Sequence, residues 1–272
     1  MTIKVNLYGN TFNHNIINNK ISSTLGKQPK NIEYVLDGSG SINIFIDRSV
    51  YDVHKVNNGK TNFAWLIESN IATDLVQYFK NLTLEDKKIF EYIFTHNKDL
   101  LSLNSNFRFL NPIGYWVEDD LTIEKTKVVS MVLSDKKYTK QQINRLKFAK
   151  DNKNSIDIFG SGLHPIAKKE IGLNNYCFSV VFENAISDDY FSEKILDCFA
   201  TKTIPIYSGT KNITNYFDRN GIIFIEDFNI EDLTFSFYEQ KINAVNNNFQ
   251  TVKNYRIPED LMYKKYLIWI NN

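Results

Sequence analysis

Short apolar runs alternate with polar segments along the first half of this chain. Apolar runs of strand length occur at residues 3–7, 42–46, 63–66 and 92–95, and such runs are typical of buried strands. Between them, residues 71–79 and 84–90 carry apolar side chains at helical spacing. Strands that alternate with helices predict a parallel sheet and therefore an α/β fold.

The same alternation is clearest in the second half, at residues 178–207. Residues 178–182 form an apolar run that is β-branched at its centre, which predicts a buried parallel strand. Polar residues end this strand, a polar loop and a helical pattern follow, and residues 203–207 predict the next strand. Open α/β sheets bind their ligands at strand-to-helix junctions of this kind.

Two charged residues, Glu193 and Lys194, fall in the first turn of the predicted helix. The positive end of the helix dipole favours an acid there and disfavours a lysine. A bound anion would explain the lysine, because the helix N–H groups and the ammonium together would hold a diphosphate. The spacing alone is equally consistent with a solvated lysine beside an ordinary helix-start acid. These residues by themselves leave both interpretations open.

Three motifs follow one another in this segment: Phe182-Glu-Asn184, Tyr190-Phe-Ser-Glu-Lys194 and Ile204-Pro-Ile-Tyr-Ser-Gly209. Their order and spacing resemble the donor-binding signature of the α1,3/α1,4-fucosyltransferases, glycosyltransferase family 10. The resemblance implies an α/β enzyme of the GT-B fold, with two Rossmann-like lobes facing a cleft. It also implies GDP-fucose as the donor substrate and an oligosaccharide or glycan hydroxyl as the acceptor.

Two upstream segments, residues 127–134 and 155–162, are similar to further parts of the family pattern. Arg145 lies between them on a predicted helix, where a charged side chain is ordinarily exposed. The resemblance implies instead that Arg145, together with Lys194, grips the diphosphate, while the other matched residues contact sugar, ribose or guanine. The complete set of implied donor-binding residues is Arg145, Glu183, Asn184, Tyr190, Glu193 and Lys194.

The first half of the chain resembles the family more weakly. Residues 63–70 form an apolar run that ends in an acid, and residues 92–96 form a second apolar run. The family places its catalytic carboxylate at a strand end in this half, so the resemblance implies Glu68 as the general base. Without the resemblance, Glu68 is an acid at a strand end, and such a residue is only occasionally catalytic.

These residue types suit an inverting transfer of fucose. A carboxylate that removes the proton of the attacking hydroxyl contributes about 10² to 10⁴ in rate. Cations and helix N–H groups stabilise the charge that develops on the departing GDP. The sequence has no Asp-x-Asp pair or histidine cluster that could hold a divalent ion, so we expect no metal and no cofactor. Two alternatives stay open: another GDP-deoxyhexose as donor, or a catalytically inactive sugar-nucleotide-binding module.

We expect an acceptor-side lobe at residues 1–120, a GDP-sugar lobe at 127–250 and a C-terminal helix at 256–272 that can pack back on the first lobe. Proline at the first helical position, early acids and later lysines predict this last helix. We expect its Leu261, Tyr266 and Trp269 to pack on the protein. The asparagine-rich stretch before it is interpreted as compositional.

Composition narrows the possible classes further. The chain has 272 residues, is 43% hydrophobic and 23% charged, and carries a net charge of +1, which fits a globular protein of two lobes without a basic face for nucleic acid. No window approaches the about 18 apolar residues of a membrane span. The N-terminus lacks a signal pattern, so we expect a cytoplasmic protein. The two cysteines have no framework spacing, which predicts reduced core residues.

Overall fold

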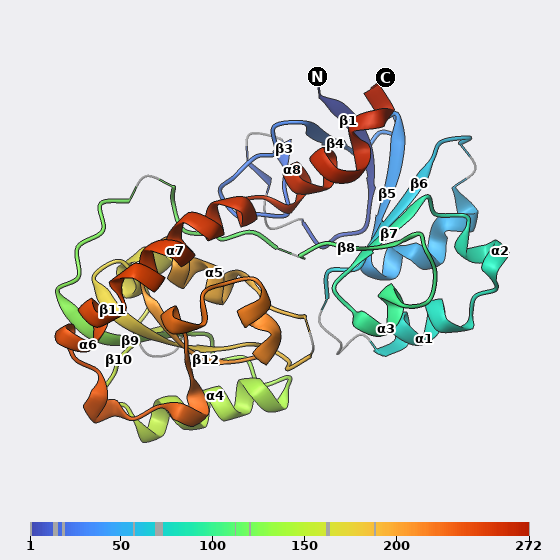
Figure 1. Ribbon diagram of the computed structural model, residues 1–272. Coiled ribbons are helices and arrows are strands. Elements are labelled where there is room, and N and C mark those ends of the chain that lie inside the picture. The colour runs from blue at the N-terminus through green and yellow to red at the C-terminus, as the bar shows by residue number, and fades with distance from the viewer. Residues whose placement is uncertain are drawn as a thin grey trace. The chain divides into compact units, whose positions relative to one another are not determined.

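The chain forms two compact units in a computed structural model (Figure 1). The structure describes residues 2–12, 16–17, 20–56, 58–68, 73–111, 113–119, 121–161, 164–187 and 189–271. Met1–Gly114 and Tyr255–Asn272 make up unit 1, and Tyr115–Asn254 makes up unit 2. Each unit is described by itself. Both contain a parallel sheet with helices, which confirms the predicted α/β class.

Unit 1 is built on a sheet whose described strands run in the order β4-β1-β5-β6-β7-β8. Every neighbouring pair is parallel. The strands are β1 (Ile3–Tyr8), β4 (Ile32–Val35), β5 (Ile42–Ile46), β6 (Asn62–Trp65), β7 (Tyr92–Thr95) and β8 (Phe107–Phe109). A small antiparallel pair, β2 (Ile16–Ile17) and β3 (Lys20–Ile21), forms a separate two-stranded sheet.

Helical segments cover both faces of the unit 1 sheet, which is why its central strands are almost uninterrupted apolar runs. Alternate residues of β5 face opposite ways: Ile44 and Ile46 pack in one core and Phe45 in the other. The core around Phe45 takes in residues of η2 (Asp47–Lys55), α1 (Thr73–Asn81) and α3 (Lys98–Leu101), and α2 (Leu84–Lys87) lies between these helices in the chain.

The C-terminal segment supplies the other core of unit 1. It comprises α8 (Pro258–Met262), the π-helical η9 (Tyr263–Leu267) and η10 (Ile268–Asn271), and Figure 1 shows it beside the first strands of the chain. Met262 and Leu267 are fully buried there. Leu261 and Tyr266 are partly buried against this core, as predicted, whereas Trp269 is 46% exposed and its predicted packing on the protein is wrong.

Unit 2 has a second parallel sheet, with its described strands in the order β10-β9-β11-β12-β13. The strands are β9 (Lys127–Leu133), β10 (Asp157–Gly160), β11 (Tyr176–Phe182), β12 (Ile204–Ser208) and β13 (Ile223–Phe224). All seven residues of β11 are buried, as expected for a strand in the middle of a covered sheet.

The α-helices of unit 2 are α4 (Lys140–Asp151), α5 (Glu193–Ala200), α6 (Phe235–Gln240) and α7 (Ile242–Val252). Its short 3₁₀ segments are η3 (Lys169–Gly172), η4 (Lys211–Asn215), η5 (Arg219–Gly221), η6 (Ile225–Asp227), η7 (Ile230–Asp232) and η8 (Lys253–Tyr255), the last of which ends in unit 1. Within the described ranges, no helix has both the length and the apolarity needed to cross a membrane.

The asparagine-rich stretch in α7 has a structural role, so its interpretation as merely compositional is wrong. Asn248 is buried, its side-chain carbonyl accepts the N–H of Asp218 at 2.7 Å, and its amide donates to the Asp218 carbonyl at 3.1 Å. A polar side chain can be buried when both of its ends are bonded in this way. The residue therefore ties α7 to the turn before η5.

Both sheets share one topology: the first strand of the sheet lies between the second and the third. Ligands of open α/β sheets bind at this topological switch point, outside the carboxyl ends of the first and third strands. In unit 1 these strands are β1 and β5, and in unit 2 they are β9 and β11. Gly160 ends β10 beside this point with φ +118, and a Cβ there would collide with the Leu133 carbonyl, so only glycine fits.

Candidate functional site

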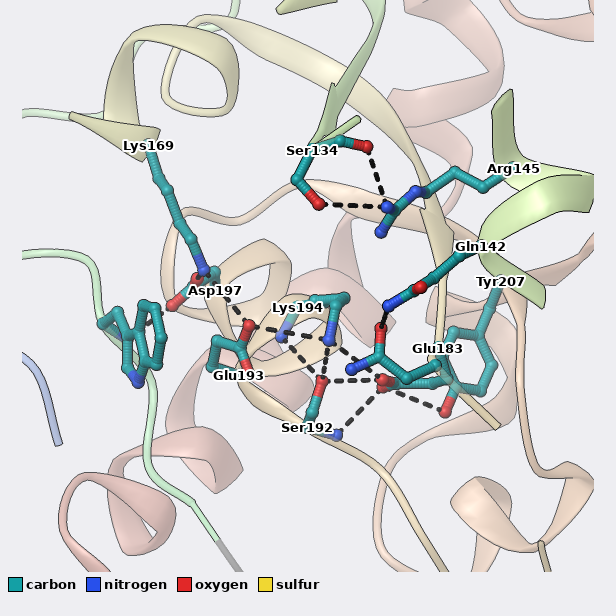
Figure 2. Close-up of polar contacts among 12 residues, drawn as sticks. Ser134, Gln142, Arg145, Lys169, Glu183, Ser192, Glu193, Lys194, Asp197 and Tyr207 are labelled. Carbon is teal, nitrogen blue, oxygen red and sulfur yellow. Dashed lines mark hydrogen bonds and ion pairs between the residues drawn. The ribbon is translucent and has the colours of Figure 1, made fainter. Parts of the chain in front are cut away.

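Polar side chains from four segments meet at the switch point of the unit 2 sheet (Figure 2). Ser134 directly follows β9, and Glu183 directly follows β11. Arg145 comes from α4, and Lys194 lies in the first turn of α5. The six residues predicted to bind a donor all lie in this unit.

Glu183 orders the start of α5. Its side chain is fully covered, and its carboxylate accepts the N–H of Ser192 at 2.9 Å and the Ser192 hydroxyl at 2.6 Å. The Tyr207 hydroxyl donates to it at 3.4 Å. Ser192 is the N-cap residue of α5 and accepts the N–H of Lys194 at 3.4 Å. The buried carboxylate thus holds the cap of the helix, the ordering role that a strand-end acid can have.

Lys194 lies between two carboxylates at the N-terminus of α5. Its Nζ is 3.5 Å from Glu183 and 3.6 Å from Glu193, and it donates to the Ser192 hydroxyl at 2.9 Å. Burial lowers the pKa of Lys194 and the nearby Arg145 guanidinium lowers it too, but the two glutamates raise it by more, so the pKa lies above its ordinary value. Lys194 is therefore a permanent cation at neutral pH.

Arg145 is a buried cation that bonds only neutral groups among the described residues. Its guanidinium donates to the Ser134 carbonyl at 2.8 Å and to the Ser134 hydroxyl at 3.0 Å, and its Nε–H has no partner among the residues the structure describes. Burial lowers the pKa of Arg145, and Asp135 offsets part of that effect. Because Arg145 also lowers the pKa of Lys194, the two cations are close enough to repel each other.

The sequence reasoning missed Lys169 and Asp197, which extend this charged group. The Lys169 ammonium is 2.8 Å from Asp197 and 3.5 Å from Glu193, and lies 4.3 Å from the centre of the Trp116 ring. Burial raises the pKa of Glu193, but Lys194 and Lys169 lower it by more, to about 2. Residues four apart lie on one face of a helix. The spacing of the two acids Glu193 and Asp197 was therefore the sequence signal that could have pointed to a cation such as Lys169 between them.

Asn184 and Tyr190 flank the charged group. The amide of Gln142 donates to the Asn184 side-chain carbonyl at 3.4 Å, and Gln142 also completes the capping box of α4 with Thr139. The cap of α4 is thereby tied to the end of β11. Tyr190 is buried, and its N–H donates to the Ser187 carbonyl at 3.3 Å within the loop before α5.

Glu68, the predicted base, belongs to unit 1 and follows β6 by three residues. Its side chain is exposed, its N–H donates to Asp47 at 3.1 Å, and its carbonyl lies 3.1 Å from His96 Nε2. Residues 69–72, where the predicted motif and helix meet, lie outside the described residues. The structure places Glu68 at the carboxyl end of a parallel strand, and its role stays a prediction.

A family profile described as Glycosyltransferase family 10 (fucosyltransferase) C-term matches residues 122–269, which is more than half of the chain. The chain belongs to glycosyltransferase family 10. The resemblance seen in the sequence motifs is therefore confirmed. The matched region of this family 10 protein contains every predicted donor-binding residue, from Arg145 to Lys194.

A curated fucosyltransferase matches a shorter stretch of the sequence, and solved structures match the fold over most of the chain. The Alpha-(1,3)-fucosyltransferase FucT of Helicobacter pylori is 33% identical over 63 residues, which cover 23% of this chain and 13% of that protein. Two crystal structures, one of alpha1,3-Fucosyltransferase and one of alpha1,3-Fucosyltransferase with GDP-fucose, are 14% identical to this chain, with TM-scores of 0.53 and 0.50. They match 99% of this chain over 88% and 89% of theirs.

A crystal structure of TarM is 12% identical to this family 10 protein with a TM-score of 0.50, and matches 84% of this chain over 54% of its own. At such identities these likenesses show the fold alone, which is the GT-B class with two parallel α/β units.

Cys177 and Cys198 are free and buried, as predicted. In the described part of the chain, no three His, Cys, Asp or Glu side chains are grouped to hold a metal ion.

Proposed function

We propose that this family 10 protein transfers L-fucose from GDP-fucose to a hydroxyl of an oligosaccharide or glycan, with inversion at the sugar and in α1,3 linkage. The observation that carries this proposal is the pair of cations at the unit 2 switch point, Arg145 and Lys194, which repel each other. Family membership, the Helicobacter pylori fucosyltransferase and a solved fucosyltransferase with GDP-fucose support the donor and the reaction.

The diphosphate of GDP is the anion that suits this pair of cations. It would bond the Arg145 Nε–H, which has no partner among the described residues, and offset the repulsion between the two cations. A hydrogen bond to a charged group contributes about 1.5–3 kcal/mol. Lys194 already has Glu183 and Glu193 as partners, so its net gain on binding should be smaller than that of Arg145.

The remaining donor residues form the proposed surroundings of the sugar, ribose and guanine. Asn184 and Tyr190 lie at the two ends of the loop that joins β11 to α5, and their amide and phenol groups can bond hydroxyls. Glu193 can accept two hydrogen bonds from a ribose diol through its carboxylate. Glu183 takes part through Ser192, because its carboxylate is fully covered and already holds the helix cap.

The chemistry requires a base on the acceptor hydroxyl and charge stabilisation on the departing GDP. We assign the base to Glu68, whose side chain is exposed at the end of a parallel strand. Arg145, Lys194 and the N–H groups of the α5 N-terminus would stabilise the leaving diphosphate, because their attraction strengthens as negative charge develops on it. Cationic side chains then take the part that a divalent ion has in metal-dependent transferases.

A donor and acceptor screen tests the proposal. The protein is incubated with GDP-fucose, with a second GDP-deoxyhexose such as GDP-rhamnose, or with GDP-mannose, together with a panel of oligosaccharides, and products are read by mass spectrometry. A mass gain of one fucose only with GDP-fucose supports the proposal, and NMR of the product reports its anomer and linkage. Transfer only from another GDP-deoxyhexose would show that this sugar nucleotide, and not GDP-fucose, is the donor. GDP binding without any hydrolysis or transfer would show that the protein is a sugar-nucleotide-binding module and not an enzyme.

Metal independence is tested in the same assay. Chelator should leave the rate of fucose transfer nearly unchanged if Arg145 and Lys194 supply the positive charge. Loss of activity in chelator that manganese restores would contradict this part of the proposal and leave the choice of donor intact.

A further inference from the structure

A buried carboxylate, that of Asp47, lies at the switch point of the unit 1 sheet. Asp47 directly follows β5 and is 7% exposed. Its Oδ1 accepts the backbone N–H of Ile67 at 2.7 Å and that of Glu68 at 3.1 Å. Its Oδ2 accepts the Thr11 hydroxyl at 3.4 Å. One side chain therefore joins the segments that follow three neighbouring strands, β1, β5 and β6.

The backbone at Asp47 is in an unusual conformation. Its φ is +49, a left-handed value that aspartate tolerates better than most side chains. The Ser49 hydroxyl lies 2.8 Å from the Tyr8 carbonyl and 2.9 Å from the Ile46 carbonyl, which holds this turn against the end of β1. Residues in sparsely populated conformations persist where their surroundings hold them, and they concentrate at functional sites.

The charge state of Asp47 suits an anchoring role. Burial raises the pKa of its carboxyl to about 6, although the two backbone N–H groups partly offset this effect. At neutral pH the group is thus ionised and accepts hydrogen bonds only. A buried carboxylate is costly unless it is bonded, and the bonds of its Oδ1 go to the backbone that carries Glu68.

Unit 2 has a carboxylate at the matching place in its own sheet. Glu183 directly follows β11, the third strand of that sheet, just as Asp47 directly follows β5. Glu183 holds the cap residue Ser192 and through it the turn that presents Lys194. The same topology thus places a buried acid beside a candidate site residue in both units.

We propose that Asp47 is a positioning residue that sets the direction of the Glu68 side chain. This inference rests on the proposed function, in which Glu68 is the general base. Asp47 holds the N–H of Glu68, and His96 Nε2 lies 3.1 Å from its carbonyl, so the backbone is held on both sides while the side chain is exposed. A base must lie within hydrogen-bond reach of its hydroxyl, and a misplacement of about 1 Å can cost roughly 10²-fold in rate.

Two substitutions separate positioning from other roles. Asp47→Gly removes the anchor and fits the positive φ without strain. Asp47→Asn also fits the backbone and keeps an oxygen for the two N–H groups, but it cannot act as a base. We expect Asp47→Gly to lower kcat for fucose transfer at least about tenfold, below the full cost of misplacement, with KM for GDP-fucose unchanged. We expect Asp47→Asn to stay within about threefold of wild type.

A double-mutant cycle links the effect to Glu68. If Asp47 acts through Glu68, adding Asp47→Gly to Glu68→Gln should cause little further loss of kcat, because the base is already absent. Independent, multiplicative losses would overturn the proposal. A kcat for Asp47→Asn as low as that of Glu68→Gln would also overturn it, since Asp47 would then be needed for its basicity and not for its bonds.

Amide hydrogen exchange tests the anchor without any activity. The amides of Ile67 and Glu68 should exchange at least about tenfold faster in Asp47→Gly than in wild type, because each loses a buried acceptor. Glu259→Ala is the matched control: this buried acid also holds a backbone N–H in unit 1, that of Ser23 at 2.7 Å, and its loss should leave both amides unchanged. Unchanged exchange in Asp47→Gly would overturn the anchor even if the protein transfers no fucose.

Discussion

Replacing Arg145 with methionine should separate donor binding from folding. Methionine keeps most of the apolar part of the buried Arg145 side chain on α4 and removes its positive charge. The guanidinium bonds only the two oxygens of Ser134 among the described residues, and its Nε–H is left for a ligand. If it bonds the diphosphate, GDP binding should weaken by about 1.5–3 kcal/mol, which raises Kd roughly 10- to 150-fold.

The stability of the ligand-free protein should change much less. The wild type already carries the cost of a guanidinium that is 4% exposed and that repels Lys194. Methionine removes this cost but also removes two hydrogen bonds to Ser134, and the two effects act in opposite directions. We expect the free energy of unfolding to change by less than about 1 kcal/mol, a small change among core substitutions.

Titration calorimetry with GDP and urea unfolding measure the two quantities on the same samples. Arg219→Met is the matched control, because Arg219 lies in unit 2, is partly exposed, pairs with Asp227 at 3.4 Å and packs on the Phe224 ring. Its loss should leave the affinity for GDP unchanged. An Arg145→Met protein that binds GDP as wild type does would refute the diphosphate role. A loss of several kcal/mol in stability would make Arg145 a structural residue.

Three further outcomes follow from the same contacts. Lys194→Met should weaken GDP binding less than Arg145→Met does, and should lower the free energy of unfolding because Glu183 and Glu193 both lose a cation; equal stability in urea would contradict this. Glu68→Gln should lower transfer at least about 10²-fold at unchanged GDP affinity, and near-normal turnover would exclude it as the base. The lysines hold the pKa of Glu193 at about 2 against an ordinary 4.5. Its contribution, at most about 3 kcal/mol, is therefore present above pH 4.5 and lost as the pH falls toward 2; urea unfolding of Glu193→Gln should lack this dependence.

Local patterns in the sequence predicted most of the elements that carry the site. The strands at 42–46 and 92–95 have the predicted bounds, because a buried parallel strand is a short apolar run between polar residues. Short or half-exposed strands such as β4 and β8 give no such run and were missed. Helix α7 was missed because its asparagines hid the apolar repeat of Ala244, Val245 and Val252.

Some residues of the candidate site could likewise be found from the sequence and others could not. Arg145 and Lys194 were found because they stand in motifs whose order and spacing resemble a family. Lys169 was not found, because it comes from a separate segment, η3, and reaches Glu193 and Asp197 only through the fold. A contact between residues far apart in sequence leaves no local signal.

The sequence by itself determined the α/β class, the family and the residue types of the donor site, because periodicity and motif spacing are local properties of a chain. Only the tertiary structure decided which of these residues are buried, which repel each other and which are anchored. The reason is strand order: parallel pairing brings the ends of β9 and β11 together in unit 2, and those of β5 and β6 in unit 1. That long-range pairing makes Arg145 a buried cation beside Lys194 and places Asp47 against the backbone of Glu68.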